Sequence, residues 1–229
     1  MVGGQVSEHL EKTDTNMQRL LPGVIAMAAI VVASNILVQF LILDGLLTWG
    51  AFTYPFAFLV TDLMNRAYGP QSARKVVFAG FIVGVICSLI GSQIMLQGDG
   101  YEYAAVALRI AVASGIAFLV AQLVDVAIFD RMRSGAWWRA PLASTIIGSA
   151  LDTTLFFTIA FAQSVPFFSE NANMEISWAW DAMPLLTFGP DAPLWVSLAI
   201  ADWAVKMAIA LIALVPFRVL SEKIQNVVT

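Results

Sequence analysis

Charge, cysteine and histidine are all scarce in this sequence of 229 residues. Only 12% of the residues are charged and 59% are hydrophobic, whereas about a quarter of a soluble domain is charged. The single cysteine, Cys87, excludes an internal disulfide, and together with the single histidine, His9, it excludes a Cys/His metal site and a histidine-based catalytic triad. No GxxxxGK[ST] loop is present to cradle a phosphate. We therefore expect an integral membrane protein that has no cofactor and no ATPase activity of this type.

Six apolar stretches are long enough, or nearly so, to cross about 30 Å of hydrocarbon. They cover residues 22–43, 46–65, 76–96, 104–129, 141–162 and 193–217. Pro55 interrupts the second stretch, which predicts a broken or kinked helix that is covered by protein or lines a cavity. The predicted fold is an all-α integral membrane protein with six transmembrane helices in residues 21–218. A polar tail, 1–20, precedes them and a second tail, 219–229, follows.

The distribution of the cations predicts the orientation. Outside the predicted helices, lysine and arginine occur in the two tails and in the segments after the second and fourth helices, but in none of the other three loops. The positive-inside rule places the cation-bearing segments, and so both termini, in the cytoplasm. The net charge of −4 and the lack of a basic stripe argue against a nucleic-acid partner. The long outer loop, 164–193, is expected to lie in the membrane interface or to close over a site as a lid.

Six charged residues fall inside the predicted helices. They are Asp62, Arg109, Asp125, Asp152, Asp202 and Lys206. An ionised group in lipid costs at least about 2.5 kcal/mol, so such residues face the interior of a bundle and mark candidate functional sites. Asp202 and Lys206 lie four positions apart on one helix, so a purely structural ion pair explains them as well as a functional role does. Arg109, near the outer end of its helix, is as well placed to reach the outer interface as to contact a ligand.

Two helices share a pattern in which a polar residue, an aspartate and an aromatic residue lie on one face. The fourth carries Gln122, Asp125 and Phe129, and the fifth carries Ser149, Asp152 and Phe156. The alternatives are a shared polar pocket and interhelical hydrogen bonding, of which the pocket is favoured because a carboxylate is costly as a purely structural contact. Further candidates for the cavity are Asn35 and Gln39 on the first helix, and Trp203, which could stack on a flat ligand or simply pack. Carboxylates and amides together predict a small polar ligand rich in N–H donors.

Several motifs resemble those of one transporter family. They are YPFAFLVTDLMNRAYGP at 54–70, ARKVVFAGF at 73–81, RIAVAS at 109–114, QLVD at 122–125 with Phe129, and LDT at 151–153 with Phe156 and Phe157. In this order they resemble the queuosine precursor transporter family, also called the vitamin uptake transporter family. The likeness covers the chain from the first helix to the last. One departure is Gly148-Ser149-Ala150, where the family pattern has Ser-Gln-Leu.

The resemblance implies a bacterial inner-membrane importer of 7-deazaguanines, such as 7-cyano-7-deazaguanine or 7-aminomethyl-7-deazaguanine, that serve tRNA modification. It also implies a six-helix fold similar to the substrate-binding component of energy-coupling-factor transporters. The alternative function is a vitamin-binding component that transports only with a separate ATPase. An intramembrane enzyme with paired aspartates is disfavoured, because no motif places two acids at catalytic spacing in one segment. A homo-oligomer is left open.

A 7-deazaguanine suggests roles for the candidate residues. Its N1–H and exocyclic amine lie side by side, so one carboxylate can accept both. Asp152 is the first candidate for this role and Asp125 is the alternative. Gln122 and Asn35 are candidates to contact the carbonyl oxygen, and an aromatic ring, that of Trp203 or Phe156, is a candidate to stack on the base. Asp62, Arg109, Asp202 and Lys206 complete the predicted substrate-binding set.

Overall fold

The computed structural model describes residues 2–38, 40–43, 45–98 and 102–228. The chain is mostly helical, and five of its helices contain segments long and apolar enough to cross a membrane. These helices are α1 (Val2–Leu37), α4 (Pro70–Gly91), α5 (Leu108–Met132), α6 (Arg139–Phe161) and α8 (Leu194–Val228). In α1 the apolar segment is Gln18–Leu37, and the helix itself extends back through most of the predicted N-terminal tail. The prediction of a mostly helical, multi-pass membrane protein is confirmed.

The second predicted helix differs from the other five because it is broken at proline. It forms a single turn, α2 (Gly50–Thr53), and then α3 (Phe56–Tyr68), with Pro55 between them. Proline has no N–H to continue the helical hydrogen bonds. The 13 residues of α3 rise only about 20 Å, less than the roughly 30 Å of a hydrocarbon core. The break predicted at Pro55 is thus found, and five of the six predicted transmembrane segments form single helices of spanning length in the described residues.

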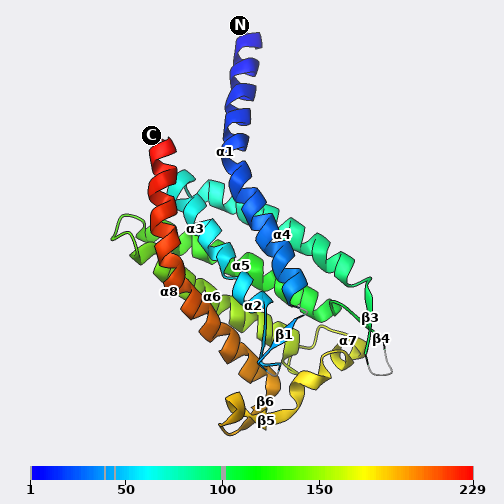
Figure 1. Ribbon diagram of the computed structural model, residues 1–229. Helices are drawn as coiled ribbons and strands as arrows, with labels where there is room; N and C mark the ends of the chain where they lie inside the picture. The colour runs from blue at the N-terminus through cyan, green and yellow to red at the C-terminus, as the bar shows by residue number, and fades with distance from the viewer. Residues whose placement is uncertain (1, 39, 44, 99–101, 229) are drawn as a thin grey trace.

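Three short hairpins lie at the end of the molecule opposite to the chain termini (Figure 1). Their strands are all antiparallel: β1 (Leu41–Ile42) with β2 (Leu47–Thr48), β3 (Met95–Gln97) with β4 (Glu102–Ala104), and β5 (Ala182–Pro184) with β6 (Asp191–Pro193). Between α6 and α8 the chain also forms α7 (Glu170–Met174) and two 3-10 turns, η1 (Ser177–Trp180) and η2 (Leu185–Thr187). The sequence predicted none of these strands. Gln39, a predicted site candidate, lies outside the described residues.

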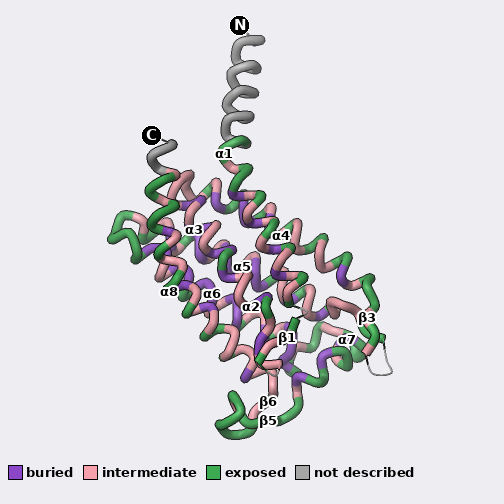
Figure 2. Tube along the Cα trace, viewed as in Figure 1, coloured by how far each residue is buried: buried purple, intermediate pink, exposed green. Residues whose placement is uncertain are grey.

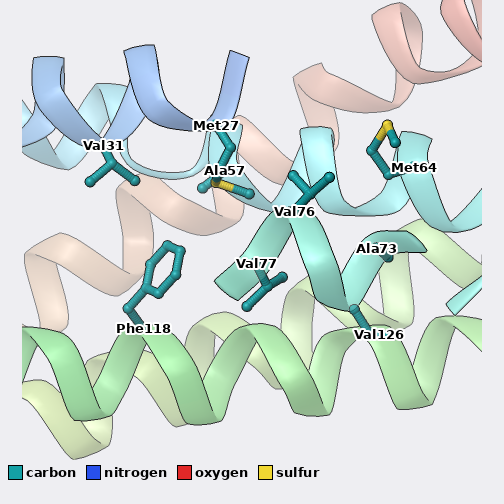
Figure 3. Close-up of a cluster of buried hydrophobic side chains, with 9 residues drawn as sticks. All are labelled: Met27, Val31, Ala57, Met64, Ala73, Val76, Val77, Phe118 and Val126. Carbon is teal, nitrogen blue, oxygen red and sulfur yellow. The ribbon is translucent and has the colours of Figure 1, made fainter. Parts of the chain in front are cut away.

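The helices pack through small and apolar side chains. The main core is one buried apolar cluster that includes Met27 and Val31 of α1, Val76 and Val77 of α4, and Phe118 of α5 (Figure 3). Outward faces of α4 and α8 are exposed along their length (Figure 2) and carry large apolar side chains, such as those of Phe78, Ile82, Leu211 and Ile212. An apolar surface of this extent is what a lipid bilayer covers. The polar side chains of the helices are instead collected inside.

Candidate functional site

Helix α6 presents a buried polar face along most of its length. Ser144, Thr145, Ser149, Asp152 and Thr153 are all at most 7% exposed although their helix is otherwise apolar. Thr145, Ser149 and Asp152 are four and three residues apart, and Ser144 and Thr153 adjoin the first and last of them, so all five share one side of the helix. This side is packed against α5 and α8, and α3 also contacts α6. Two groups of polar residues from these elements meet it, one towards each end.

The first group, which we call the ion cluster, consists of Tyr54, Asp152, Thr153, Asp202 and Lys206. The Lys206 ammonium lies 2.7 Å from Asp152 Oδ2 and 2.5 Å from Asp202 Oδ2. The Tyr54 hydroxyl donates to Asp152 Oδ1 at 2.9 Å. Thr153 donates to Asp202 at 2.8 Å, and Lys206 to Thr153 at 3.0 Å. The predicted pairing of Asp202 with Lys206 is thus found, and Asp152 of a different helix shares it.

The second group, which we call the carboxylate cluster, lies between α3, α5 and α6. Its residues are Thr61, Asp62, Asn65, Gln122, Asp125, Ser144 and Thr145. Ser144 and Thr145 donate to the two carboxylate oxygens of Asp62 at 3.1 and 3.3 Å. Thr61 donates to Gln122 Oε1 at 2.6 Å, and Asn65 Nδ2 donates to the carbonyl of Val126 at 2.9 Å. These contacts join α3 to both of its neighbours.

The carboxylate cluster holds four buried polar atoms without a hydrogen-bond partner. They are Asp125 Oδ1, Asp125 Oδ2, Asn65 Oδ1 and Gln122 Nε2. All three side chains are fully buried. The Asp62 carboxyl and the Ser144 hydroxyl are close neighbours of the Asp125 carboxyl, but neither makes a hydrogen bond of good geometry with it. Buried polar atoms are normally hydrogen-bonded, so each exception calls for an explanation. Three free acceptors and one free donor, gathered in one place, suit a bound polar ligand.

On α6 the nearest residues of the two clusters, Thr145 and Asp152, are seven positions apart, about two helical turns. A Cβ at Gly148 would stand 3.3 Å from Asp125 Cβ and 2.9 Å from a ring carbon of Phe58, so the absence of a side chain lets α5 and α3 approach α6 here. Asp152 follows four residues later, a rise of about 6 Å. The two faces predicted to form a single pocket are indeed on neighbouring helices, but Asp125 and Asp152 belong to different clusters.

A small cavity adjoins the carboxylate cluster. Asp62 and Thr145 line it together with apolar residues of α8, among them Ala210 and Phe217, and its volume is about 10 Å³. That is room for about one water molecule, whereas pockets for small organic ligands usually measure about 300–1,000 Å³. A ligand the size of a purine therefore requires α3, α6 and α8 to separate.

Besides Arg109, three predicted residues lie away from both clusters. The Asn35 side chain donates to the carbonyl of Val31 on its own helix at 2.8 Å. Trp203 is 41% exposed and lies on the outward side of α8. Phe156 packs edge-on against Phe157 and Phe161, in an apolar cluster beneath the outer loop. The aromatic wall expected beside the aspartates is thus not formed by Phe156 or Trp203 in this conformation.

Arg109 is fully buried and holds the end of α6 to the outer loop. Its guanidinium donates to the carbonyls of Ile159 and Ala162 at 2.9 and 2.5 Å, and to Asn173 Oδ1 of α7 at 2.6 Å. The last carbonyls of a helix have no partner within it, so these bonds cap α6. Arg109 was predicted to reach either the membrane interface or a ligand, but its hydrogen bonds are instead made to α6 and α7.

Replacing Arg109 with Met should destabilise the protein by several kcal/mol, because hydrogen bonds to a charged group contribute about 1.5–3 kcal/mol each and the freed carbonyls stay buried. The unfolding temperature in detergent would measure the loss. Arg131, an exposed cation near the other end of the same helix, provides the control Arg131→Met. Equal stability of the two variants would contradict the capping role.

Six of the cluster residues were not among the candidates predicted from the sequence. All six are uncharged, so the cost of burying charge did not mark them: Tyr54, Thr61, Asn65, Ser144, Thr145 and Thr153. A signal was present for those on α6, because Ser144, Thr145, Gly148, Ser149 and Asp152 form a small and polar stripe at helical spacing. Tyr54 and Thr61 flank the break at Pro55 and have no periodic signal of their own.

Most of the chain, including both clusters, matches a known family. Residues 48–220, which include both clusters, match the family model described as putative vitamin uptake transporter. The chain belongs to this family. No solved structure gives a significant match.

Named relatives of this family member support a transport role. The chain is 41% identical to the queuosine precursor transporter of Escherichia coli. The matched region covers 65% of this chain and 71% of that relative. It is 35% identical to the probable queuosine precursor transporter of Haemophilus influenzae, over 80% of this chain and 73% of the relative. It is 26% identical to the probable queuosine precursor transporter of Bacillus subtilis, over 77% of this chain and 72% of the relative. These relatives are named as transporters and not as enzymes.

Proposed function

We propose that this protein imports a queuosine precursor, a 7-deazaguanine such as the 7-cyano or 7-aminomethyl compound, across the bacterial inner membrane. Membership of the vitamin uptake transporter family and the names of the relatives support the transport role. The observation that carries the choice of ligand is the set of four unpartnered atoms in the carboxylate cluster. Their chemistry complements one edge of a guanine.

The match is made atom by atom. A guanine edge presents N1–H and the exocyclic amine as adjacent donors, and O6 as an acceptor beside them. Asp125 offers two free acceptor oxygens to the donors, and Gln122 Nε2 offers a free donor to O6. Asn65 Oδ1 is a third free acceptor, suited to the second N–H of the amine or to a ring N–H. Gln122 and Asp125 are three residues apart on α5, so they present one edge-reading surface.

This arrangement favours Asp125 over Asp152 as the ligand-binding carboxylate. Both oxygens of Asp152 already accept a hydrogen bond, one from Tyr54 and one from Lys206. A ligand at Asp152 would compete with the Tyr54 hydroxyl and the Lys206 ammonium for the same two oxygens. Among the described residues no lysine or arginine pairs with Asp125, whose charged neighbour is the Asp62 carboxyl.

The proposal includes a topology. The chain would cross the membrane six times, α2 and α3 together forming the second crossing, with both termini in the cytoplasm. The positions of the termini at one end and of three hairpins at the other support an even number of crossings (Figure 1). The break at Pro55 is acceptable inside a bilayer because protein surrounds it: Tyr54 bonds to α6, and α3 packs against α1, α4, α5 and α8. We further propose a transmembrane domain over 21–218 and a likeness to the substrate-binding component of energy-coupling-factor transporters.

The test is the queuosine content of tRNA in a bacterium that lacks both its own importer and precursor synthesis. Expression of this protein should restore queuosine when one of the two precursors is supplied, and the precursor that works names the substrate. If neither restores queuosine while the protein is present in the membrane, the import proposal fails. A requirement for a separate ATPase complex would instead support the vitamin-binding component.

A further inference from the structure

We propose that the ion cluster binds the proton that drives import, with Asp202 as the proton-binding residue. This inference rests on the proposed import function but concerns a different group of residues from the ligand-binding carboxylate cluster. It makes the protein a proton-coupled carrier that moves one proton together with its substrate.

The first observation is an imbalance of charge. Within the ion cluster, two carboxylates, Asp152 and Asp202, share a single ammonium ion, that of Lys206. Among the residues that the structure describes, no other lysine or arginine makes an ion pair or hydrogen bond with either carboxylate. One negative charge is therefore in excess inside an apolar bundle, where an uncompensated charge is costly. Binding of one proton removes that excess.

The second observation distinguishes the two carboxylates. Asp152 is 6% exposed and both of its oxygens are engaged, by Tyr54 and Lys206. Asp202 is 15% exposed, and both Lys206 and Thr153 contact the same oxygen, Oδ2. Oδ1 of Asp202 has no partner in the described structure. A proton can therefore bind there without breaking any contact.

The groups facing Lys206 and Asp202 come from three neighbouring elements. Tyr54, between α2 and α3, places its ring 5.4 Å from the ammonium. Helix α6 supplies Asp152 and Thr153. The titratable group of α3 nearest along α8 is Asp62, which lines the small cavity beside Ala210, about one turn from Lys206, and makes no hydrogen bond or ion pair with the described residues of the ion cluster. Of these groups, Tyr54 is a neutral donor and Asp62 belongs to the carboxylate cluster.

The position of the cluster explains how a proton could be coupled to movement. Three polar contacts of the ion cluster tie α8 to α6: Lys206 with Asp152, Lys206 with Thr153, and Asp202 with Thr153. When Asp202 takes a proton at Oδ1, its carboxylate becomes a neutral acid and attracts Lys206 and the Thr153 hydroxyl less strongly. The tie between α6 and α8 then weakens, and these are two of the helices that must separate for a base to reach the carboxylate cluster. Release of the proton to the cytoplasm restores the tie.

The experiment uses the full-length protein in proteoliposomes with a labelled 7-deazaguanine. Exchange of labelled for unlabelled substrate needs no gradient, whereas accumulation against a concentration difference needs coupling. We expect Asp202→Asn to retain exchange within about threefold and to lose accumulation driven by an acidic exterior more than tenfold. Asp130→Asn, at a half-buried ion pair with Arg133 that belongs to neither cluster, should behave like the wild type in both assays.

Wild-type vesicles provide a measurement that depends on no variant. Adding substrate outside vesicles without an imposed gradient should make the exterior more alkaline, which a pH dye detects. Absence of this signal, accumulation driven by a sodium gradient alone, or full accumulation by Asp202→Asn would each overturn proton coupling at Asp202. Failure of exchange in the wild type would overturn the import proposal instead, so the two failures are distinguishable.

Discussion

Replacing Asp125 with Asn is expected to lower the apparent affinity for a 7-deazaguanine by about 10- to 100-fold, because leaving a buried donor unpaired costs about 1–3 kcal/mol. The amide keeps the shape of the side chain but turns one acceptor into a donor, which then faces an N–H of the base. The measurement is the substrate concentration that gives half-maximal exchange in proteoliposomes. Asp130→Asn, the same change at a half-buried acid on the same helix, is the matched control.

A substrate analogue tests the same contact from the other side. A 7-deazapurine with O6 but no exocyclic amine removes one donor, so the wild type should bind it more weakly than the parent compound. Asp125→Asn should discriminate less between the two, because the bond to that amine is already lost. If Asp125→Asn exchanges substrate like the wild type, while Asp152→Asn does not, the ligand contacts Asp152 and our assignment is wrong.

Replacing Lys206 with Met is expected to destabilise the fold by about 3–5 kcal/mol, the usual cost of breaking a buried ion pair by removing one partner. Methionine fills a similar volume, so the effect comes from the uncompensated charges of Asp152 and Asp202 and not from a cavity. The unfolding temperature in detergent and the yield of monodisperse protein report it. Lys223→Met, at an exposed lysine near the C-terminus, should leave both unchanged.

The origin of this loss can be checked by removing the acids as well. A triple variant, Lys206→Met with Asp152→Asn and Asp202→Asn, carries no charge in the ion cluster and should regain most of the stability. It should still fail to accumulate substrate in response to a pH gradient. If Lys206→Met alone is as stable as the wild type, the lysine does not balance ionised carboxylates, and the charge imbalance on which the coupling proposal depends is absent.

The sequence by itself determined the class of the protein and the set of charged residues inside it. Long apolar stretches require a bilayer, and five of them are helices of spanning length at nearly the predicted positions. The cost of burying charge selected six residues without any knowledge of contacts, and Asp62, Asp125, Asp152, Asp202 and Lys206 all lie in one of the two clusters. The family was also evident, because its motifs are runs of consecutive residues.

Only the tertiary structure decided which of these groups share a partner. Helical periodicity tells which residues lie on one face, but contacts between helices depend on how each helix is rotated and how far it is shifted along its neighbour. Asp152 therefore pairs with a lysine 54 positions away. Asp125 of the neighbouring helix lies beside Gly148, one turn before Asp152, and has no cationic partner among the described residues. The same limit applies to Arg109, whose acceptors lie on α6 and α7 and could not be found from its own helix. Local pattern specifies each helix, whereas the packing of the bundle determines which charges are balanced and which atoms remain free to bind.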